Sequence, residues 1–190
     1  CASTRASSCA SVIARPRPIE PWEYLVDAAT CELLQIRALF FNVAARVFDP
    51  NPVVRLNAPG LQDQDNASAA VPESAYSTVD LPGLATSGPL SGPNVRIVDR
   101  EQPFTPSADS SQPLIFDRGV PGFEEVMAYF HLDRSQRYLQ SLGYTGALRI
   151  VAAPLEVDAH AGSADNSFFT IEGLGQGGLY FGDGGVDDAE

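Results

Sequence analysis

Residues 121–143, with the sequence PGFEEVMAYFHLDRSQRYLQSLG, contain the clearest helical pattern of the chain. Six apolar residues recur at helical spacing and form one stripe: Phe123, Val126, Met127, Phe130, Tyr138 and Leu142. Pro121 suits the first turn of a helix, where a missing N–H costs nothing, and Gly143 supplies a stop. The pattern predicts one long helix from about residue 122 to residue 142.

Charged and polar side chains on this segment agree with a helix. Glu124 and Glu125 lie in the first turn, where carboxylates interact favourably with the positive end of the helix dipole. Asp133 and Arg137 have the spacing of a supporting ion pair. His131 lies beside the apolar stripe, which favours a packed or hydrogen-bonded histidine.

Segments on both sides of the helix carry strand patterns. Short apolar or alternating runs predict strands at 22–27, 32–37, 38–45, 76–81, 95–98, 114–116, 148–151, 155–157, 167–171 and 178–181. The first two runs flank a turn at 28–31 and predict a hairpin, with Cys31 where such a turn favours glycine. Pro50 and Pro52 predict an extended path through 47–54. The expected fold class is α+β, a mainly antiparallel twisted sheet with one long helix.

Composition limits the possible partners. The formal net charge is -12, and every basic residue is an arginine. Nucleic acids and anionic membranes bind proteins through Lys and Arg that neutralise phosphate, so neither is expected as a partner. No run approaches the roughly 18 consecutive apolar residues of a membrane-spanning helix. The acidity is explained either by solubility or by calcium binding at some of the aspartates.

The start of the chain carries little that could be buried. Residues 1–18 are mostly Ser, Ala, Arg and Pro, and a frayed segment is expected. No signal peptide pattern follows Cys1, which favours a removed start or an internal piece. Cys1, Cys9 and Cys31 lack the spacing of a zinc site and are interpreted as incidental.

The sequence contains no recognisable zinc-binding, dinucleotide-binding or serine-nucleophile motif. His131 and His160 are far apart and belong to no His-Glu-x-x-His pattern, so no metal ligand is assigned, and His160 is expected to meet solvent in a loop. Residues 173–178, GLGQGG, match G-x-G-x-x-G, but a strand-like piece follows where a dinucleotide site needs a helix. A hairpin turn is the better interpretation. No Gly-x-Ser-x-Gly elbow occurs, and no catalytic residue is assigned.

Three segments in a fixed order carry a family resemblance. Residues 128–134 (AYFHLDR), 166–169 (NSFF) and 181–185 (FGDGG) resemble the amino-terminal lobe of thermolysin-like and fungalysin-like zinc metallopeptidases. Residues 26–31 (VDAATC) resemble the closing hairpin of the propeptide modules that precede many such enzymes, with Cys31 in place of the usual glycine.

The resemblance implies a division of the chain into three parts. The expected parts are a frayed start at 1–18, the end of a propeptide-type hairpin module at 19–46, and an incomplete amino-terminal lobe of a metallopeptidase domain at 47–190. In this family the zinc-binding His-Glu-x-x-His helix follows soon after such a lobe, and this chain stops before it. The chain is therefore expected to be inactive alone, with the missing catalytic lobe as a partner.

The resemblance also implies a function for the 166–169 segment. The parent protein would be a secreted zinc endopeptidase in which zinc activates water and the Glu of the missing motif is the general base. In this chain Asn166 would hold the main chain of a protein or peptide substrate, Ser167 would contribute main-chain groups, and Phe168 would form part of an apolar subsite wall. Zinc would belong to the full-length protein and would not be bound by these residues.

Other interpretations remain open from the sequence. A non-catalytic, secreted, β-rich binding or structural module predicts an ordinary packed strand at 165–169. A propeptide-type inhibitor rests on 22–37 alone. Calcium is a second cofactor candidate, because Asp183, Asp187, Asp188 and Glu190 cluster near the end, although a solvated acidic loop explains them equally well.

Overall fold

The computed structural model describes residues 9–14, 22–38, 40–62, 67–100, 106–151, 154–163, 166–171 and 177–183. Two compact units divide the chain between Phe41 and Asn42. Among the described residues, no helix combines the length and the apolar character that crossing a membrane requires.

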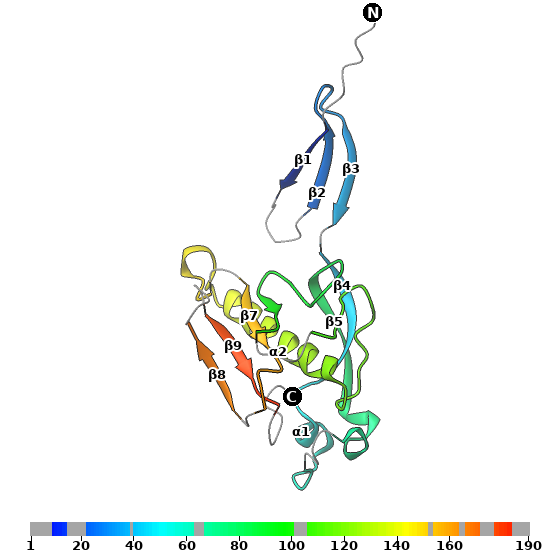
Figure 1. Ribbon diagram of the computed structural model, residues 1–190, viewed down its shortest axis with the longest axis vertical. Helices are drawn as coiled ribbons and strands as arrows, with labels where there is room; N and C mark the ends of the chain where they lie inside the picture. Colours follow the sequence, from blue (N-terminus) through cyan, green and yellow to red (C-terminus); the bar gives the residue numbers. More distant parts are fainter. Residues whose placement is uncertain are drawn as a thin grey trace, which may run out of the picture. The chain divides into compact units, whose positions relative to one another are not determined.

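The first unit contains a three-stranded antiparallel sheet in the order β1-β2-β3 (Figure 1). Its strands are β1 (Cys9–Ala14), β2 (Trp22–Asp27) and β3 (Leu33–Ala38). The predicted hairpin is confirmed in β2 and β3. Residues 9–14, which composition places in a frayed start, pair along the whole of β2, because strand hydrogen bonds use the backbone and need no apolar side chains.

The turn between β2 and β3 shows how the chain does without glycine. Cys31 has a φ of 57°, in the left-handed region that glycine adopts most easily. The Asp27 carboxylate accepts hydrogen bonds from the backbone N–H groups of Ala29 at 2.8 Å and Thr30 at 2.9 Å. These bonds lower the pKa of Asp27 and hold the turn.

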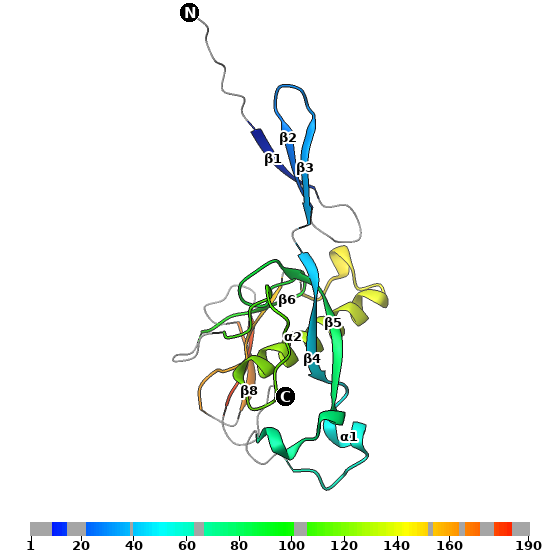
Figure 2. The same cartoon turned by 90° about the vertical axis from the view of Figure 1, so that its right-hand side faces the viewer.

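The second unit contains the long helix and two sheets. Its main elements are β4 (Phe40–Phe48, whose first two residues precede the division), α1 (Pro52–Leu56), β5 (Tyr76–Ala85), β6 (Val95–Ile97), α2 (Pro121–Ser141), β7 (Leu155–Asp158), β8 (Ser167–Thr170) and β9 (Gly178–Phe181). Three 3-10 turns complete the set: η1 (Ser68–Ala70), η2 (Glu73–Ala75) and η3 (Gly146–Leu148). Strands β4 and β5 form a two-stranded sheet and lie side by side in Figure 2.

The larger sheet has the order β6-β7-β9-β8, and α2 lies against β6 and β7. Strands β6, β7 and β9 are mutually parallel neighbours, whereas β8 pairs antiparallel with β9. The α+β class with one long helix is confirmed. The sheets were expected to be mainly antiparallel; the first unit and the β8–β9 pair are antiparallel, whereas β6, β7 and β9 make this sheet mixed.

Helix α2 begins at Pro121 and ends at Ser141, as predicted, and Gly143 follows with a φ of 98°. Its first half fills the core: Phe123, Val126 and Tyr129 are each 0% exposed. The predicted apolar stripe is wrong in the second half, where Tyr138 is 63% and Leu142 57% exposed. There the buried side of the helix is polar instead.

Three local predictions fail for identifiable reasons. Residues 47–54 are not extended throughout, because the Asn51 side chain caps α1 by accepting from the Val54 N–H at 2.9 Å. Segment 114–116 contributes only one bridge, between Leu114 and Ala45. The 148–151 segment continues from η3 into bends rather than a strand, after Gly146 takes a positive φ of 56°.

Candidate functional site

Strand β8 forms an outer edge of the four-stranded sheet, so the predicted substrate-binding segment lies where an added strand could pair. Asn166 and Ser167 are exposed, and the exposed fractions of Phe168 and Phe169 are 42% and 56%. Both aromatic side chains of this strand are therefore partly packed and partly exposed.

Hydrogen bonding fixes which main-chain groups of β8 face outward. The Gly182 N–H donates to the Asn166 carbonyl at 3.0 Å, and the register pairs Phe168 with Tyr180. Antiparallel neighbours alternate between pairs that exchange hydrogen bonds and pairs that do not. The main-chain groups of Phe168 therefore face β9, and those of Ser167 and Phe169 face the free edge.

The two aromatic side chains of β8 have different surroundings. The Phe168 ring stacks on Tyr180 with a centroid distance of 4.9 Å and an interplanar angle of 2°. The Phe169 ring covers Gly177, where a Cβ would collide with it. Phe168, which is 42% exposed and stacks on the buried Tyr180, thus offers apolar surface beside the outward main-chain groups.

A second cluster lies at the start of α2, and sequence reasoning missed it. The expectation that His160 meets solvent is wrong, since only 5% of the residue is exposed. Its Nδ1 is 2.9 Å from the Glu124 Oε2 and 3.0 Å from the Asp183 Oδ1. Its Nε2 is 3.1 Å from the Pro121 carbonyl oxygen. We call Glu124, His160 and Asp183 the Glu-His-Asp cluster.

Sheet topology brings these residues together. His160 and Asp183 each follow the end of a strand by two residues, and those strands, β7 and β9, are parallel neighbours. Parallel neighbours end at the same edge of a sheet, and the Ala161 N–H donates to the Phe181 carbonyl there at 2.6 Å. Helix α2 starts at that edge and supplies Glu124 from its first turn. The sequence alone did not indicate that β7 and β9 are neighbours, so it did not bring His160 and Asp183 together.

Glu125 is buried beside the cluster but binds the backbone of a neighbouring loop. Its two carboxylate oxygens accept hydrogen bonds from the backbone N–H groups of Ser107 and Ala108, each at 2.7 Å. Desolvation raises the pKa of Glu125, and these hydrogen bonds oppose the rise. Its Oε1 is 3.8 Å from the His160 Nε2, on the opposite side of the ring from Glu124.

Burial and neighbouring charges shift the pKa of His160 in opposite directions. Burial lowers the pKa of His160, but hydrogen bonds and charge interactions with Glu124 and Asp183 outweigh it and raise the pKa to about 9. Without a metal ion, the ring is therefore a buried imidazolium at neutral pH.

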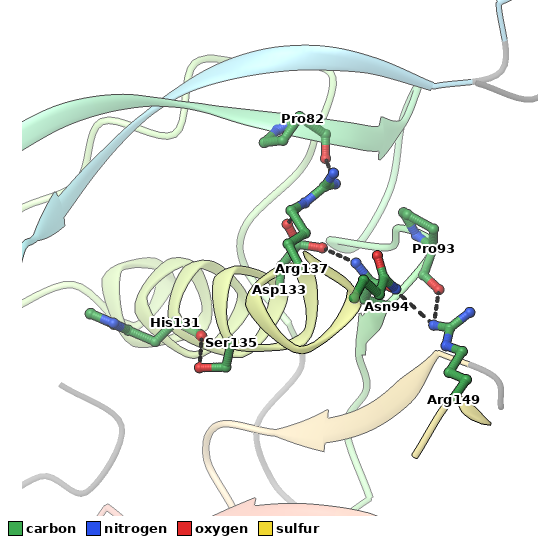
Figure 3. Close-up of polar contacts among 9 residues, drawn as sticks. Pro82, Pro93, Asn94, His131, Asp133, Ser135, Arg137 and Arg149 are labelled. Carbon is green, nitrogen blue, oxygen red and sulfur yellow. Dashed lines mark hydrogen bonds and ion pairs between the residues drawn. The ribbon is translucent and has the colours of Figure 1, made fainter. Parts of the chain in front are cut away.

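A third polar group ties the second half of α2 to the β5–β6 region, and Figure 3 shows it. Asp133 is 4% exposed and accepts from the Asn94 Nδ2 at 2.7 Å and from the Arg137 Nε at 2.5 Å, which confirms the predicted ion pair. Arg149 donates to the Asn94 Oδ1 and to the Pro93 carbonyl, each at 3.0 Å. These contacts join residues of the fold to one another and indicate a structural role.

The remaining candidate residues have simple outcomes. His131 is half-buried with its Nε2 3.1 Å from the Phe48 carbonyl oxygen, as expected of a hydrogen-bonded histidine. Cys31 is free and exposed, and the Cys1 prediction lies outside the described residues. Of the proposed calcium ligands, Asp187, Asp188 and Glu190 also lie outside them.

Comparison with known proteins adds no further support. No family model, curated protein or solved structure matches the chain. Its function must therefore be inferred from the exposed edge of β8 and from the Glu-His-Asp cluster.

Proposed function

We propose that this chain is part of a secreted zinc-dependent endopeptidase and supplies the edge strand that binds the substrate main chain. The observation that carries the proposal is the exposed edge of β8, where the N–H and C=O groups of Ser167 and Phe169 face outward. Strand addition to such an edge recognises extended peptides through main-chain hydrogen bonds.

Neighbouring side chains suit the same role. Asn166 is exposed at the start of the strand, where its amide can bond a peptide group of the substrate. Phe168, stacked on Tyr180, provides apolar surface for one substrate side chain. Alternate side chains of a bound strand point the same way, so this surface would select at one substrate position.

The residues present do not fit the catalytic zinc of such an enzyme. Three protein ligands are usual, two of them close together on one helix, and the chain has only His131 and His160. Neither lies at β8: His131 faces Phe48, and His160 belongs to the Glu-His-Asp cluster. The zinc ligands and the general base would come from residues outside these 190, and the 190 residues alone are expected to bind peptides without hydrolysing them.

Peptide binding to the purified chain tests the proposal. Ser167→Pro removes an outward N–H and leaves the pairing of β8 with β9 intact, so it should weaken binding of an extended apolar peptide at least about tenfold. Ser167→Ala keeps the main chain and is the matched control, expected to bind like the parent. Backbone NMR shifts confined to β8 on peptide addition would locate the site.

Two results would overturn this function. One is equal peptide affinity in Ser167→Pro and Ser167→Ala. The other is a coding sequence that continues past Glu190 without a His-Glu-x-x-His motif, which would favour a non-catalytic binding or structural module. Zinc-dependent hydrolysis by the purified 190 residues would contradict the proposed division of labour.

A further inference from the structure

The Glu-His-Asp cluster places three electron-pair donors around one point. The ligand atoms of Glu124, His160 and Asp183 all lie within 4.8 Å of one another, and Nδ1 is 2.9 Å and 3.0 Å from the two carboxylate oxygens. A zinc ion with ligands at about 2.0–2.1 Å in tetrahedral geometry separates them by about 3.3 Å. Nδ1 is within a few tenths of an ångström of that separation from each carboxylate oxygen, and the two oxygens, which lie within 4.8 Å of each other, would have to approach by at most about 1.5 Å.

The other nitrogen of the His160 ring, Nε2, also has surroundings that are typical of a metal-bound histidine. Nε2 is 3.1 Å from the Pro121 carbonyl oxygen, which can only accept a hydrogen bond. The ring therefore keeps a proton on Nε2, and in its neutral form the lone pair of Nδ1 points at two carboxylate oxygens. A metal-bound histidine commonly donates its other N–H to a carbonyl or carboxylate in this way.

A cation held between the three ligand atoms interacts strongly with them, because charge interactions are poorly screened in a buried site. A proton on Nδ1 is one such cation, but it can lie on a line to only one of the two oxygens. A divalent ion contacts all three ligands at once. Its charge also interacts favourably with both carboxylates, of which Glu124 is almost fully buried at 6% exposure.

We propose that Glu124, His160 and Asp183 bind a divalent transition-metal ion of the zinc type, which joins the start of α2 to the ends of β7 and β9. One imidazole and two carboxylates suit this class, whereas calcium favours six to eight oxygen ligands. Asp183, whose side chain is 25% exposed, is the member through which the ion can enter. Glu125 is not a ligand, since both of its oxygens accept backbone hydrogen bonds from Ser107 and Ala108.

The site is separate from the catalytic zinc of the proposed peptidase. That zinc needs ligands outside these residues, whereas all three ligands of this site lie in the described chain. The ion here would hold a helix start against two strand ends, and its role would be structural. If the peptide-binding test with the Ser167 variants fails, the proposed function is overturned and this inference about the metal site is not affected.

Titration of the 190-residue chain with Zn²⁺ alone, followed by calorimetry, tests the site. We expect one saturable Zn²⁺ site per chain. Glu124→Gln and Asp183→Asn should each weaken Zn²⁺ binding at least about tenfold. Asp80→Asn, which makes the same charge change at an exposed position of β5, should not.

Zn²⁺ affinity and melting temperature decide whether the metal site exists. Absence of saturable Zn²⁺ binding, or equal affinity in Asp183→Asn and Asp80→Asn, would overturn the proposal. If Glu124→Gln does not fold, the partly exposed Asp183 still provides the test. A Zn²⁺-dependent rise in melting temperature that Asp183→Asn abolishes would support it, because only the folded chain brings the three ligands together.

Discussion

At the scale of single residues, His160 shows how one buried ring can organise its surroundings. Nδ1 faces Glu124 and Asp183, Nε2 faces the Pro121 carbonyl, and the His160 backbone N–H donates to the Asp158 Oδ1 at 3.1 Å. In the metal-free chain this arrangement stabilises the imidazolium. The stability of the fold should therefore depend on pH.

The sign of that dependence follows from the raised pKa of His160. The pKa is about 9 in the folded chain against an ordinary value of 6.5, so the stabilisation is complete below pH 6.5 and lost as pH rises to about 9. In the presence of EDTA, we expect the free energy of unfolding to fall by up to about 3 kcal/mol over that window. Denaturant unfolding of the parent and of His160→Gln measures it. An equal fall in both proteins would contradict the prediction.

The titration of His131 does not contribute to the change in unfolding free energy between pH 6.5 and 9. Desolvation lowers the pKa of His131, so its contribution to stability changes only below pH 6.5. Glu125, whose pKa is raised from an ordinary 4.5, faces the same ring of His160, and its contribution is checked by repeating the titration with Glu125→Gln.

Tyr129 and Gly92 form a second residue-scale contact with a testable consequence. Tyr129 is 0% exposed, and its hydroxyl has no hydrogen-bond partner among the described residues. A Cβ at Gly92 would overlap that hydroxyl and would lie 3.0 Å from the Gly83 carbonyl oxygen. Gly92 is therefore required by packing against Tyr129.

We expect Gly92→Ala to cost about 2–3 kcal/mol of stability, because the overlap forces the buried ring to shift. Tyr129→Phe alone should change stability by less than about 1 kcal/mol, since it deletes an unpartnered polar atom. The double variant should recover at least about 1 kcal/mol relative to Gly92→Ala. Chemical denaturation of the four proteins measures this coupling, and strictly additive costs would refute it.

At the scale of elements, the two halves of α2 bury different kinds of side chain. From Phe123 to Tyr129 it buries apolar side chains, and from Asp133 to Gln136 its buried side is polar. Buried polar groups cost free energy unless they are hydrogen-bonded, and Asp133 meets that condition through Asn94 and Arg137. The second half of the helix therefore depends on one carboxylate.

Asp133→Ala should cost about 2–4 kcal/mol, because it leaves the Asn94 amide without its buried acceptor and removes the charge partner of Arg137. The matched control is Arg134→Ala on the same helix, which removes an ion pair with Asp49 that lies near the surface. That change should cost less than about 1 kcal/mol. Urea unfolding of both variants tests the difference, and comparable costs would contradict the assignment.

At the scale of the whole molecule, the buried hydrophobic core belongs to the second unit. No described residue before Val43 is part of it, and its members continue from there to Ala159. The first unit has a three-stranded sheet whose described side chains are exposed or half-buried. The second unit therefore has the means to fold alone.

We expect residues 40–190 to unfold cooperatively, with a melting temperature within about 3 °C of that of the full chain, because the truncation removes none of the core side chains that the structure describes. Residues 49–190 provide the control, since they lack the buried β4 residues Val43, Ala45, Val47 and Phe48. That shorter piece should show no cooperative transition by calorimetry. Loss of cooperativity in residues 40–190 would show that the first unit contributes to the core.

Local patterns in the sequence determined the helix, the β2–β3 hairpin and most strands. Helix α2 could be predicted because its start, its apolar spacing and its stop are all properties of neighbouring residues. Strand β8 was predicted in the same way, whereas the role inferred for 166–169 stays a prediction. The predictions for 114–116 and 148–151 failed, because 114–116 pairs with β4 only at Leu114 and 148–151 continues from η3 into bends. An apolar run forms a strand only where a neighbouring backbone pairs along its length.

Tertiary structure alone decided the sheet order and the Glu-His-Asp cluster. Parallel pairing of β7 with β9 joins residues far apart in the chain, and no local spacing reveals which strands are neighbours. That pairing placed His160 beside Asp183 and set both against Glu124 at the start of α2. Whether a charged side chain meets water or a buried partner depends on such long-range contacts, so the sequence alone left His160 in a solvent-exposed loop.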